Sequence, residues 1–359
     1  AKFGSSLAAH LCNARPRQRT HAASLMRRSL AMAVFARRAF SLAAKRPPRL
    51  VVVGGTHGNE YTGVWLAKEL ANKKLAPGVE TFMANHAAIQ ANRRFVDEDL
   101  NRCFSREKLD GFRADGAATV EAARALEVDA ALGPKGSDAA ADLVVDLHTT
   151  TANMGITIIC DAWCPFALRA AAYVQQQLKN PSDAVFGDVK IMYNAISDAE
   201  HAPYLASIGK RGLQIEVGPT PQGVVRWDVV DATRRALDAI LELAEREAAG
   251  ETVELPARVE AYSVVAGANQ KLAWPVDEQG FPTAVPHESL QDRDWHPLRK
   301  GEPLWRDHEG NTVPYDGSRG DVITPIFINE GGYYYASSGR GIGVAEKTVV
   351  DVPKACDSF

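Results

Sequence analysis

An apolar run passes directly into a polar motif in the sequence LVVVGGTHGNE at residues 50–60. Four consecutive apolar residues at 50–53 are typical of a strand that is buried on both faces, as in a parallel sheet. Residues 60–72 place apolar side chains at helical spacing among polar ones, so we expect a helix there. The motif His57-Gly58-Asn59-Glu60 therefore lies on the connecting loop of a βα unit, where functional side chains are often placed.

A second polar motif, Asp146-Leu147-His148, follows the apolar residues 143–145 in the same way. A catalytic zinc ion takes three protein ligands from histidine, aspartate and glutamate and keeps one position open, whereas structural zinc closes its shell with four. H-x-x-E followed by one distant histidine supplies three. We therefore predict that His57, Glu60 and His148 bind one Zn²⁺ per chain. The alternative is that His57 and Glu60 only cap the helix that follows them.

Strands and helices alternate along residues 49–250. Apolar spacing predicts further strands at residues 79–83, 143–147, 156–160 and 213–217, and helices at 119–131, 166–178 and 229–245. This alternation indicates an α/β fold of three layers with a mainly parallel sheet, in which ligands bind beyond the carboxyl ends of the strands. His57, His148 and Glu216 all lie at or just after such ends, so we expect them to share one crevice.

Long helical patterns stop near residue 250. Short strand patterns separated by Gly, Pro and Asp turns follow, at residues 253–265, 303–305, 322–329 and 344–352. We therefore predict three parts: a leader at residues 1–48, a catalytic α/β domain at 49–250, and a smaller β-rich domain at 251–359 that closes the active site.

The composition is that of an enzyme with a sizeable core. Of the 359 residues 46% are hydrophobic and 24% charged, which suits one large or two medium domains. The net charge of −3 argues against a nucleic-acid binder, because affinity for phosphate backbones needs a basic surface. The five cysteines include no C-x-x-C pair, so the sequence suggests neither a disulfide framework nor a thiolate zinc site.

The first acidic residue of the chain is Glu60, although eight arginines precede position 48 among many alanines and serines. Such a composition is typical of an organelle transit peptide, and the apolar stretches are too short and too interrupted by arginine to span a membrane. We therefore expect a mitochondrial or plastid location, with the cytoplasm as the alternative. A disordered basic extension, or a true start at Met26 or Met32, would have a similar composition.

Two further segments of the α/β domain carry charged side chains that suit catalysis. The sequence NRRFVDEDLNR at residues 92–102 is dense in arginine and asparagine, whose donors match a substrate carboxylate, although a solvated loop would look the same. Glu216 interrupts the apolar strand at residues 213–217, and a buried carboxylate needs a partner or a function. We expect a general base, with a salt bridge to a neighbouring arginine as the alternative.

Asp146 precedes His148 by two residues and so shares its face of an extended strand. Zinc-bound imidazoles commonly donate their second N–H to a carboxylate, which fixes the tautomer. We expect Asp146 to play this part toward His57 or His148. The alternative is a place in a hydrogen-bond network at the end of the strand.

From about residue 49 to 350 the chain resembles the aspartoacylase and aminoacylase-3 family, zinc amidohydrolases related to succinylglutamate desuccinylase and the zinc carboxypeptidases. The resemblance rests on GGTHGNE at residues 54–60, DLNR at 99–102, DLHTTTANMG at 146–155, IEVGP at 215–219, LQDRDW at 290–295 and FINE at 327–330. It implies a carboxypeptidase-like α/β domain followed by a β-rich domain that restricts access to the zinc.

The resemblance also implies a role for each candidate residue. His57, Glu60 and His148 would bind zinc, and Glu216 would act as general base and acid. Arg94 would stabilise the oxyanion of the tetrahedral intermediate. The remaining candidates would bind substrate: Asn101 and Arg102 through its α-carboxylate, and Tyr333 by closing the pocket.

The implied reaction is the zinc-dependent hydrolysis of an N-acyl-L-amino acid, most simply N-acetyl, to a carboxylate and a free amino acid. Aspartoacylases carry an arginine about ten residues before the catalytic glutamate, where this chain has Ala206, so we expect a broader specificity of the aminoacylase-3 type. Lys210, Arg211 and Tyr204 are candidates to replace that arginine. Thr149 and Gly331-Gly332 also depart from the family pattern.

Strict hydrolysis of N-acetyl-L-aspartate, a desuccinylase, a carboxypeptidase-like peptidase and a non-enzymatic zinc-binding protein are the alternatives. We expect a small-molecule partner, no nucleic acid, no membrane, and the possibility of a homo-oligomer.

Overall fold

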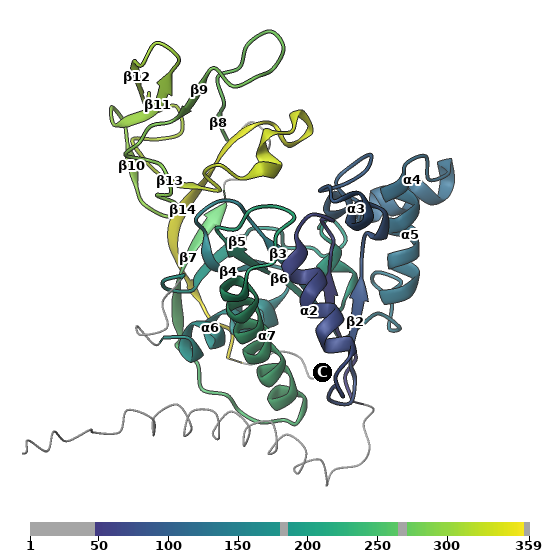
Figure 1. Ribbon diagram of the computed structural model, residues 1–359. Helices are drawn as coiled ribbons and strands as arrows, with labels where there is room; N and C mark the ends of the chain where they lie inside the picture. Colours follow the sequence, from purple (N-terminus) through teal and green to yellow (C-terminus); the bar gives the residue numbers. More distant parts are fainter. Residues whose placement is uncertain (1–46, 180–185, 265–270, 355–359) are drawn as a thin grey trace, which may run out of the picture. The chain divides into compact units, whose positions relative to one another are not determined.

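The computed structural model of this protein describes residues 47–179, 186–264 and 271–354 (Figure 1). Only the last two residues of the predicted leader fall within these ranges, so the transit peptide and the organelle stay predictions. Among the described helices, none combines the length and the apolar character needed to cross a bilayer.

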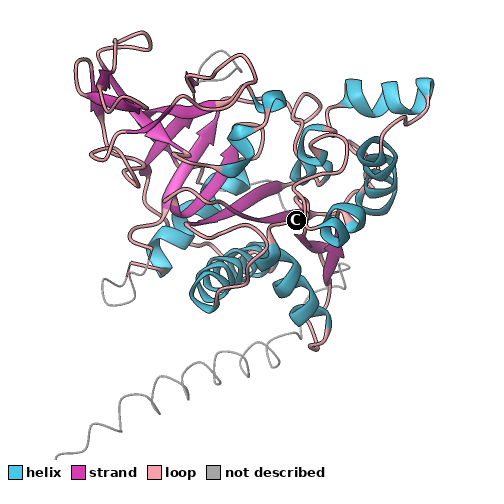
Figure 2. Cartoon of the chain, turned by 45° about the horizontal axis from the view of Figure 1, so that its top comes forward, coloured by secondary structure: helices cyan, strands magenta, loops and turns pink. Residues whose placement is uncertain are grey.

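A mixed sheet of eleven strands forms the centre of the described chain (Figure 2). Its order is β10-β13-β14-β7-β5-β4-β6-β3-β1-β2, with β8 paired to β14. The strands of the first half are β1 (Leu50–Gly54), β2 (Val79–Met83), β3 (Leu143–Thr149), β4 (Gly155–Asp161), β5 (Lys190–Asn194) and β6 (Gly212–Gly218). Those of the second half are β7 (Arg258–Val264), β8 (Leu272–Ala273), β10 (Leu298–Arg299), β13 (Val322–Ile326) and β14 (Gly341–Asp351).

Helices cover both faces of the first half of this sheet. They are α2 (Tyr61–Ala71), α3 (His86–Ala91), α4 (Arg106–Asp115), α5 (Val120–Leu132), α6 (Pro165–Gln177) and α7 (Trp227–Ala248). In β1, Leu50 and Val52 belong to the hydrophobic cluster that includes α6 and α7, whereas Val51 and Val53 belong to the cluster that includes α4 and α5. Figure 1 accordingly places α2, α6 and α7 together and apart from α4 and α5. Because successive side chains of a strand point to opposite faces, these two clusters define the predicted three layers.

Strands β2, β1, β3 and β6 are parallel to one another, whereas β4 pairs antiparallel with β6. The cause is the short connection between β3 and β4, residues 150–154, which crosses the carboxyl end of β6. Gly218 at that end would meet the backbone oxygens of Thr150 and Ala152 if it carried a Cβ. A connection of this length leads the chain back rather than over the sheet, since a parallel return needs a long crossover.

The second half of the chain extends the central sheet and adds a small one. β7 pairs with β5 and β14 pairs with β7, so strands from beyond residue 250 continue the catalytic sheet. The small sheet has the order β12-β11-β9 and consists of β9 (Ala284–Pro286), β11 (Pro303–Asp307) and β12 (Thr312–Pro314). The boundary at residues 250 and 251 stays a prediction, because the two halves share a sheet.

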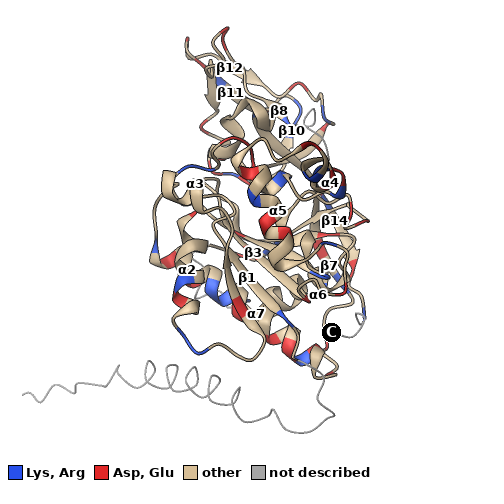
Figure 3. Cartoon of the chain, turned by 90° about the vertical axis from the view of Figure 1, so that its right-hand side faces the viewer, with Lys and Arg blue, Asp and Glu red and all other residues tan. Residues whose placement is uncertain are grey.

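The predicted elements are all present, and none of their ends lies more than five residues from the predicted one. β5, α3, α4 and the shortest strands were not predicted. Acidic and basic residues are interspersed along α2, α5 and α7 (Figure 3). One ion pair, between Glu69 of α2 and Arg234 of α7, joins two of these helices.

Candidate metal centre and active site

The three predicted zinc ligands meet at the carboxyl ends of two adjacent strands. His57 and Glu60 follow β1, and Glu60 is the residue that precedes α2, while His148 lies near the end of β3. β1 and β3 are parallel neighbours, so both ends reach the same edge of the sheet. All three side chains are buried, and one ligand atom from each lies within 4.8 Å of the others.

The distances between these atoms suit a tetrahedral ion. Nδ1 of His57 is 3.2 Å from Nδ1 of His148, and the two oxygens of Glu60 are 2.6 Å and 3.0 Å from those nitrogens. Ligands at zinc bond lengths in a tetrahedron are roughly 3.3 Å apart. The three separations are somewhat shorter than that, so the groups are close enough together to share one small cation.

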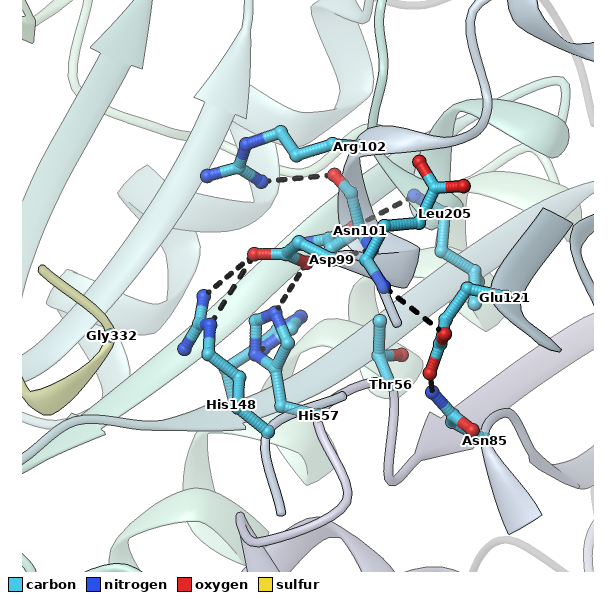
Figure 4. Close-up of polar contacts among 12 residues, drawn as sticks. Thr56, His57, Asn85, Asp99, Asn101, Arg102, Glu121, His148, Leu205 and Gly332 are labelled. Atoms are coloured by element: carbon cyan, nitrogen blue, oxygen red, sulfur yellow. Dashed lines mark hydrogen bonds and ion pairs between the residues drawn. The ribbon is translucent and has the colours of Figure 1, made fainter. Parts of the chain in front are cut away.

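The second nitrogen of each imidazole faces a carboxylate. Nε2 of His148 is 2.8 Å from Asp146, which also accepts a hydrogen bond of 2.7 Å from the hydroxyl of Thr56. Nε2 of His57 is 3.0 Å from Asp99 (Figure 4). A carboxylate at each Nε2 holds the proton there, so in the neutral rings both Nδ1 lone pairs point at one another and at Glu60. Two lone pairs and a carboxylate repel one another unless a cation lies between them, which is the arrangement of a metal site.

The charges around His57, Glu60 and His148 also favour a bound cation. Burial opposes the charged form of His148, but Asp146 and Glu60 outweigh it and raise the pKa of His148 well above its usual value. Burial by itself would raise the pKa of Glu60, but the neighbouring His57 and His148 outweigh burial and lower that pKa below its usual value. The surrounding carboxylates thus favour a positive charge at this point, and a metal ion would displace the proton as it binds.

Arg94 lies beside the three candidate ligands. Its guanidinium donates to Glu60 at 3.3 Å and to Asp99 at 3.2 Å, and lies 3.8 Å from Glu330. Burial opposes the charge of Arg94, but the surrounding carboxylates raise its pKa further. A Cβ on Gly332 would stand 2.8 Å from the guanidinium carbon, so glycine here lets the C-terminal segment lie against Arg94.

Glu216 projects from the same face of the sheet as His148. The two residues are in register across β6 and β3, and their strand neighbours Ile215 and Leu147 both belong to the opposite hydrophobic cluster. Oε1 of Glu216 is buried and has no hydrogen-bond partner within the described chain. Burial, together with the charge of Glu60, raises the pKa of Glu216 well above its usual value. A buried carboxylate oxygen beside the ligand cluster suits a group that takes up a proton.

Two family models match this chain. Residues 46–244 match the model of the succinylglutamate desuccinylase/aspartoacylase catalytic domain, and residues 258–339 match the AstE/AspA barrel-sandwich hybrid domain. The chain belongs to the succinylglutamate desuccinylase/aspartoacylase family.

Similar proteins of known name cover most of the chain. It is 36% identical to an N-acyl-aromatic-L-amino acid amidohydrolase (carboxylate-forming) of Homo sapiens, over 87% of this chain and 95% of that protein. It is 34% identical to the aspartoacylase of Rattus norvegicus, over 82% and 92% of the two chains. The crystal structure of murine aminoacylase 3 matches with a TM-score of 0.75 at 33% identity, over 87% and 99%. The predicted α/β fold with a smaller β-rich C-terminal part is thereby confirmed.

Among the other residues that the family resemblance singled out, Asn101 is held inside the protein. It lies in the short helix η1 (Leu100–Arg102). Its amide donates to Gln214 at 3.0 Å, which links η1 to β6. It also accepts from the backbone of Leu205 at 2.9 Å, which links η1 to the short helix η3 (Leu205–Ile208) (Figure 4). These contacts fix the amide, and its part in substrate binding stays a prediction.

Arg102 and Tyr333 each form a cation–π pair with a neighbouring residue. Arg102 is exposed, and its guanidinium carbon lies 5.2 Å from the centre of the Tyr204 ring. Tyr333 lies in the short helix η5 (Gly331–Tyr334), and the ammonium of Lys271 is 3.2 Å from the centre of its ring. Burial lowers the pKa of Lys271 to about 8, and the charges of Arg102 and Arg94 act in the same direction. Arg102 and Lys271 thus each pack against a tyrosine ring, and the charges of Arg102 and Arg94 reach Lys271.

Ala206, the residue expected at the position of the aspartoacylase arginine, has its side chain buried in the apolar cluster on the α4 and α5 side. Two proposed replacements lie elsewhere. Lys210 donates to Asp142 at 2.9 Å and Arg211 to the backbone oxygen of Asp142, at the start of β3 and thus at the opposite end from His148. Tyr204, beside Arg102, is the candidate that lies at the site.

Sequence reasoning missed three contributors to the site. Asp99 and Glu330 lie within the quoted motifs DLNR and FINE, which is the signal that could have identified them. Glu330, which is 4% exposed, accepts hydrogen bonds from the backbone of Thr151 at 3.0 Å and of Gly332 at 2.7 Å. It thus joins the C-terminal segment to the loop after β3. Lys271 belongs to no motif, and nothing in the sequence pointed to it.

Proposed function

We propose that this protein is a zinc-dependent amidohydrolase that converts N-acyl-L-amino acids to a carboxylate and a free amino acid. The observation that carries the proposal is the convergence of Nδ1 of His57, Nδ1 of His148 and the carboxylate of Glu60 beside the unpartnered oxygen of Glu216. Zinc, when bound there, would polarise the amide carbonyl and lower the pKa of water.

The protein's own side chains divide the remaining work. Glu216 removes a proton from the attacking water and returns it to the nitrogen of the leaving amine, a cycle that its raised pKa favours. Arg94, held in place by Glu60 and Asp99, donates hydrogen bonds to the oxyanion as the carbonyl becomes tetrahedral. Asp146 and Asp99 fix the orientation of the two imidazoles.

Replacement of Arg94 by Lys should lower kcat by about 100-fold, because one ammonium lacks the planar fork that meets Glu60 and Asp99 together. The measurement is steady-state kinetics on an N-acetyl amino acid, with Arg258→Lys as a control, since Arg258 lies exposed on β7. A kcat equal to that of the wild type would show that Arg94 does not stabilise the oxyanion.

Replacement of Arg102 by Gln should raise KM for N-acyl amino acids by roughly 30-fold and change kcat much less. A charge-assisted contact to the α-carboxylate is lost in the ground state and the transition state alike. Arg258→Gln is the matched control. An unchanged KM together with a lower kcat would contradict this role for Arg102.

Among possible substrates, we propose a preference for aromatic over acidic side chains. Ala206 supplies no cation for a side-chain carboxylate, and Tyr204 and Tyr333 offer rings near Arg102. Several relatives bear names that specify N-acyl-aromatic-L-amino acids. The test is a panel of N-acetyl-tyrosine, N-acetyl-methionine, N-acetyl-aspartate, N-succinyl-glutamate and an unblocked dipeptide. A higher kcat/KM for N-acetyl-aspartate than for N-acetyl-tyrosine would overturn the preference, and turnover of the last two alone would favour a desuccinylase or a peptidase.

A further inference from the structure

The carboxylate of Glu121, in the first turn of α5, is buried beneath the loop at residues 96–98. Its side chain is fully buried, and each of its oxygens accepts two hydrogen bonds, of which Figure 4 shows the one from Asn85. Oε1 accepts from the side-chain amide of Asn85 at 3.0 Å and from the backbone of Val96 at 2.7 Å. Oε2 accepts from the backbone of Asp97 at 2.9 Å and of Glu98 at 3.2 Å. Three consecutive backbone N–H groups thus point at one carboxylate.

The loop at residues 96–98 also binds the N-terminus of α5 through its own side chains. Asp97 accepts a hydrogen bond of 2.8 Å from the backbone of Val120, one of the helix's first N–H groups. The hydroxyl of Thr119 donates to Glu98 at 2.7 Å and accepts from the backbone of Ala122 at 2.9 Å. Acidic side chains are favoured at a helix N-terminus. Carboxylates of both the helix and the loop therefore hold the loop at residues 96–98 against the start of α5, and we call this contact the junction.

The position of this loop explains why such a junction matters. Arg94 comes two residues before it, and Asp99, which faces His57, comes directly after it. Arg102 follows one turn later in η1. The short segment at residues 94–102 therefore carries three groups of the site, and Glu121 binds the backbone in the middle of this segment.

We propose that Glu121 is a positioning residue that sets the geometry of Arg94, Asp99 and Arg102 through the backbone of residues 96–98. This inference rests on the proposed function for those three side chains. Glu121 itself lies beneath the loop and touches none of the reacting groups.

Glutamine is the informative replacement, because it keeps the shape of the side chain and changes only its hydrogen bonding. Each carboxylate oxygen of Glu121 faces two donors. Whichever way the amide is turned, its NH₂ group would point at two N–H groups, and these would lose their acceptor. The loop must then move away from α5. Glu127→Gln on the same helix is the matched control, since the Glu127 side chain is 65% exposed and pairs with Arg124 on its own helix.

Two measurements on the full-length, zinc-loaded protein separate positioning from plain stability. We expect Glu121→Gln to speed amide hydrogen exchange at residues 96–98 and to raise KM for N-acetyl-tyrosine by about tenfold, since small displacements of substrate-positioning groups are costly. Glu127→Gln should match the wild type in both. A loss of folded protein would lower the apparent kcat in proportion and leave KM unchanged.

If Glu121→Gln does not fold, Asp97→Ala tests the same junction from the exposed side by removing the acceptor of the Val120 N–H. We expect faster exchange at residues 96–98 and a smaller rise of KM in the same direction. Wild-type exchange and wild-type KM in the folded variant would overturn the proposal. An inactive wild-type protein would instead contradict the proposed function, and the exchange measurement would still report whether Glu121 holds the loop.

Discussion

Replacement of Glu216 by Gln should reduce kcat for an N-acetyl amino acid by roughly 10³-fold or more, while the zinc content stays that of the wild type. A positioned general base contributes about 10²–10⁴-fold to the rate, and here the same group also returns the proton to the leaving amine. Glu216 is not one of the three candidate ligands, so glutamine leaves the metal centre intact.

The measurements are steady-state kinetics and metal content by mass spectrometry on the same preparation. Glu260→Gln is the matched control, because Glu260 lies on β7 of the same sheet with an exposed side chain paired to Lys347. If Glu216→Gln kept more than a tenth of the wild-type kcat, another group would be the base. If it lost its zinc as well, Glu216 would act as a ligand.

Replacement of His148 by Ala should remove both the metal and the activity. Three ligands are the least that a catalytic zinc site uses, and a two-ligand remnant binds zinc far more weakly. Among the side chains that the structure describes, the substitution also leaves the fully buried Asp146 with the hydroxyl of Thr56 as its one hydrogen-bond partner. Removing one partner of a buried charged pair costs about 3 kcal/mol or more in the free energy of unfolding.

We therefore expect His148→Ala to contain less than a tenth of the wild-type zinc, to show no measurable turnover, and to unfold at lower denaturant concentration. His201→Ala is the matched control, because the His201 side chain is 84% exposed and lies outside the ligand cluster. Wild-type zinc content in His148→Ala would show that the ion is held elsewhere.

The parts of the site that the sequence could predict lie next to buried strands. His57 and Glu60 follow the apolar run of β1, and His148 ends that of β3, so their convergence followed from the rule that parallel strands end at one edge. The choice between His57 and His148 as the partner of Asp146 needed side-chain geometry. The structure places Asp146 at His148 and gives His57 a different carboxylate, Asp99.

Contacts between segments far apart in the sequence could not be predicted from local patterns. Glu330 binds the loop after β3, some 180 residues before it in the chain. Glu121 binds the backbone of residues 96–98, and the sequence of α5 does not indicate that Glu121 is buried. The continuation of the catalytic sheet into β7 and β14 was not predicted for the same reason: a local pattern indicates a strand but does not identify the strand with which it pairs. Periodicity predicts elements and their exposed or buried faces, whereas these contacts depend on how the elements pack.

Release of free tyrosine from N-acetyl-tyrosine by the purified full-length protein, before and after removal of metal with a chelator, tests the central claim most directly. We expect turnover in the protein as purified, its loss in parallel with the zinc content, and its recovery when one equivalent of Zn²⁺ per chain is added back. Undiminished turnover in protein that mass spectrometry shows to be free of metal would contradict a zinc centre at His57, Glu60 and His148.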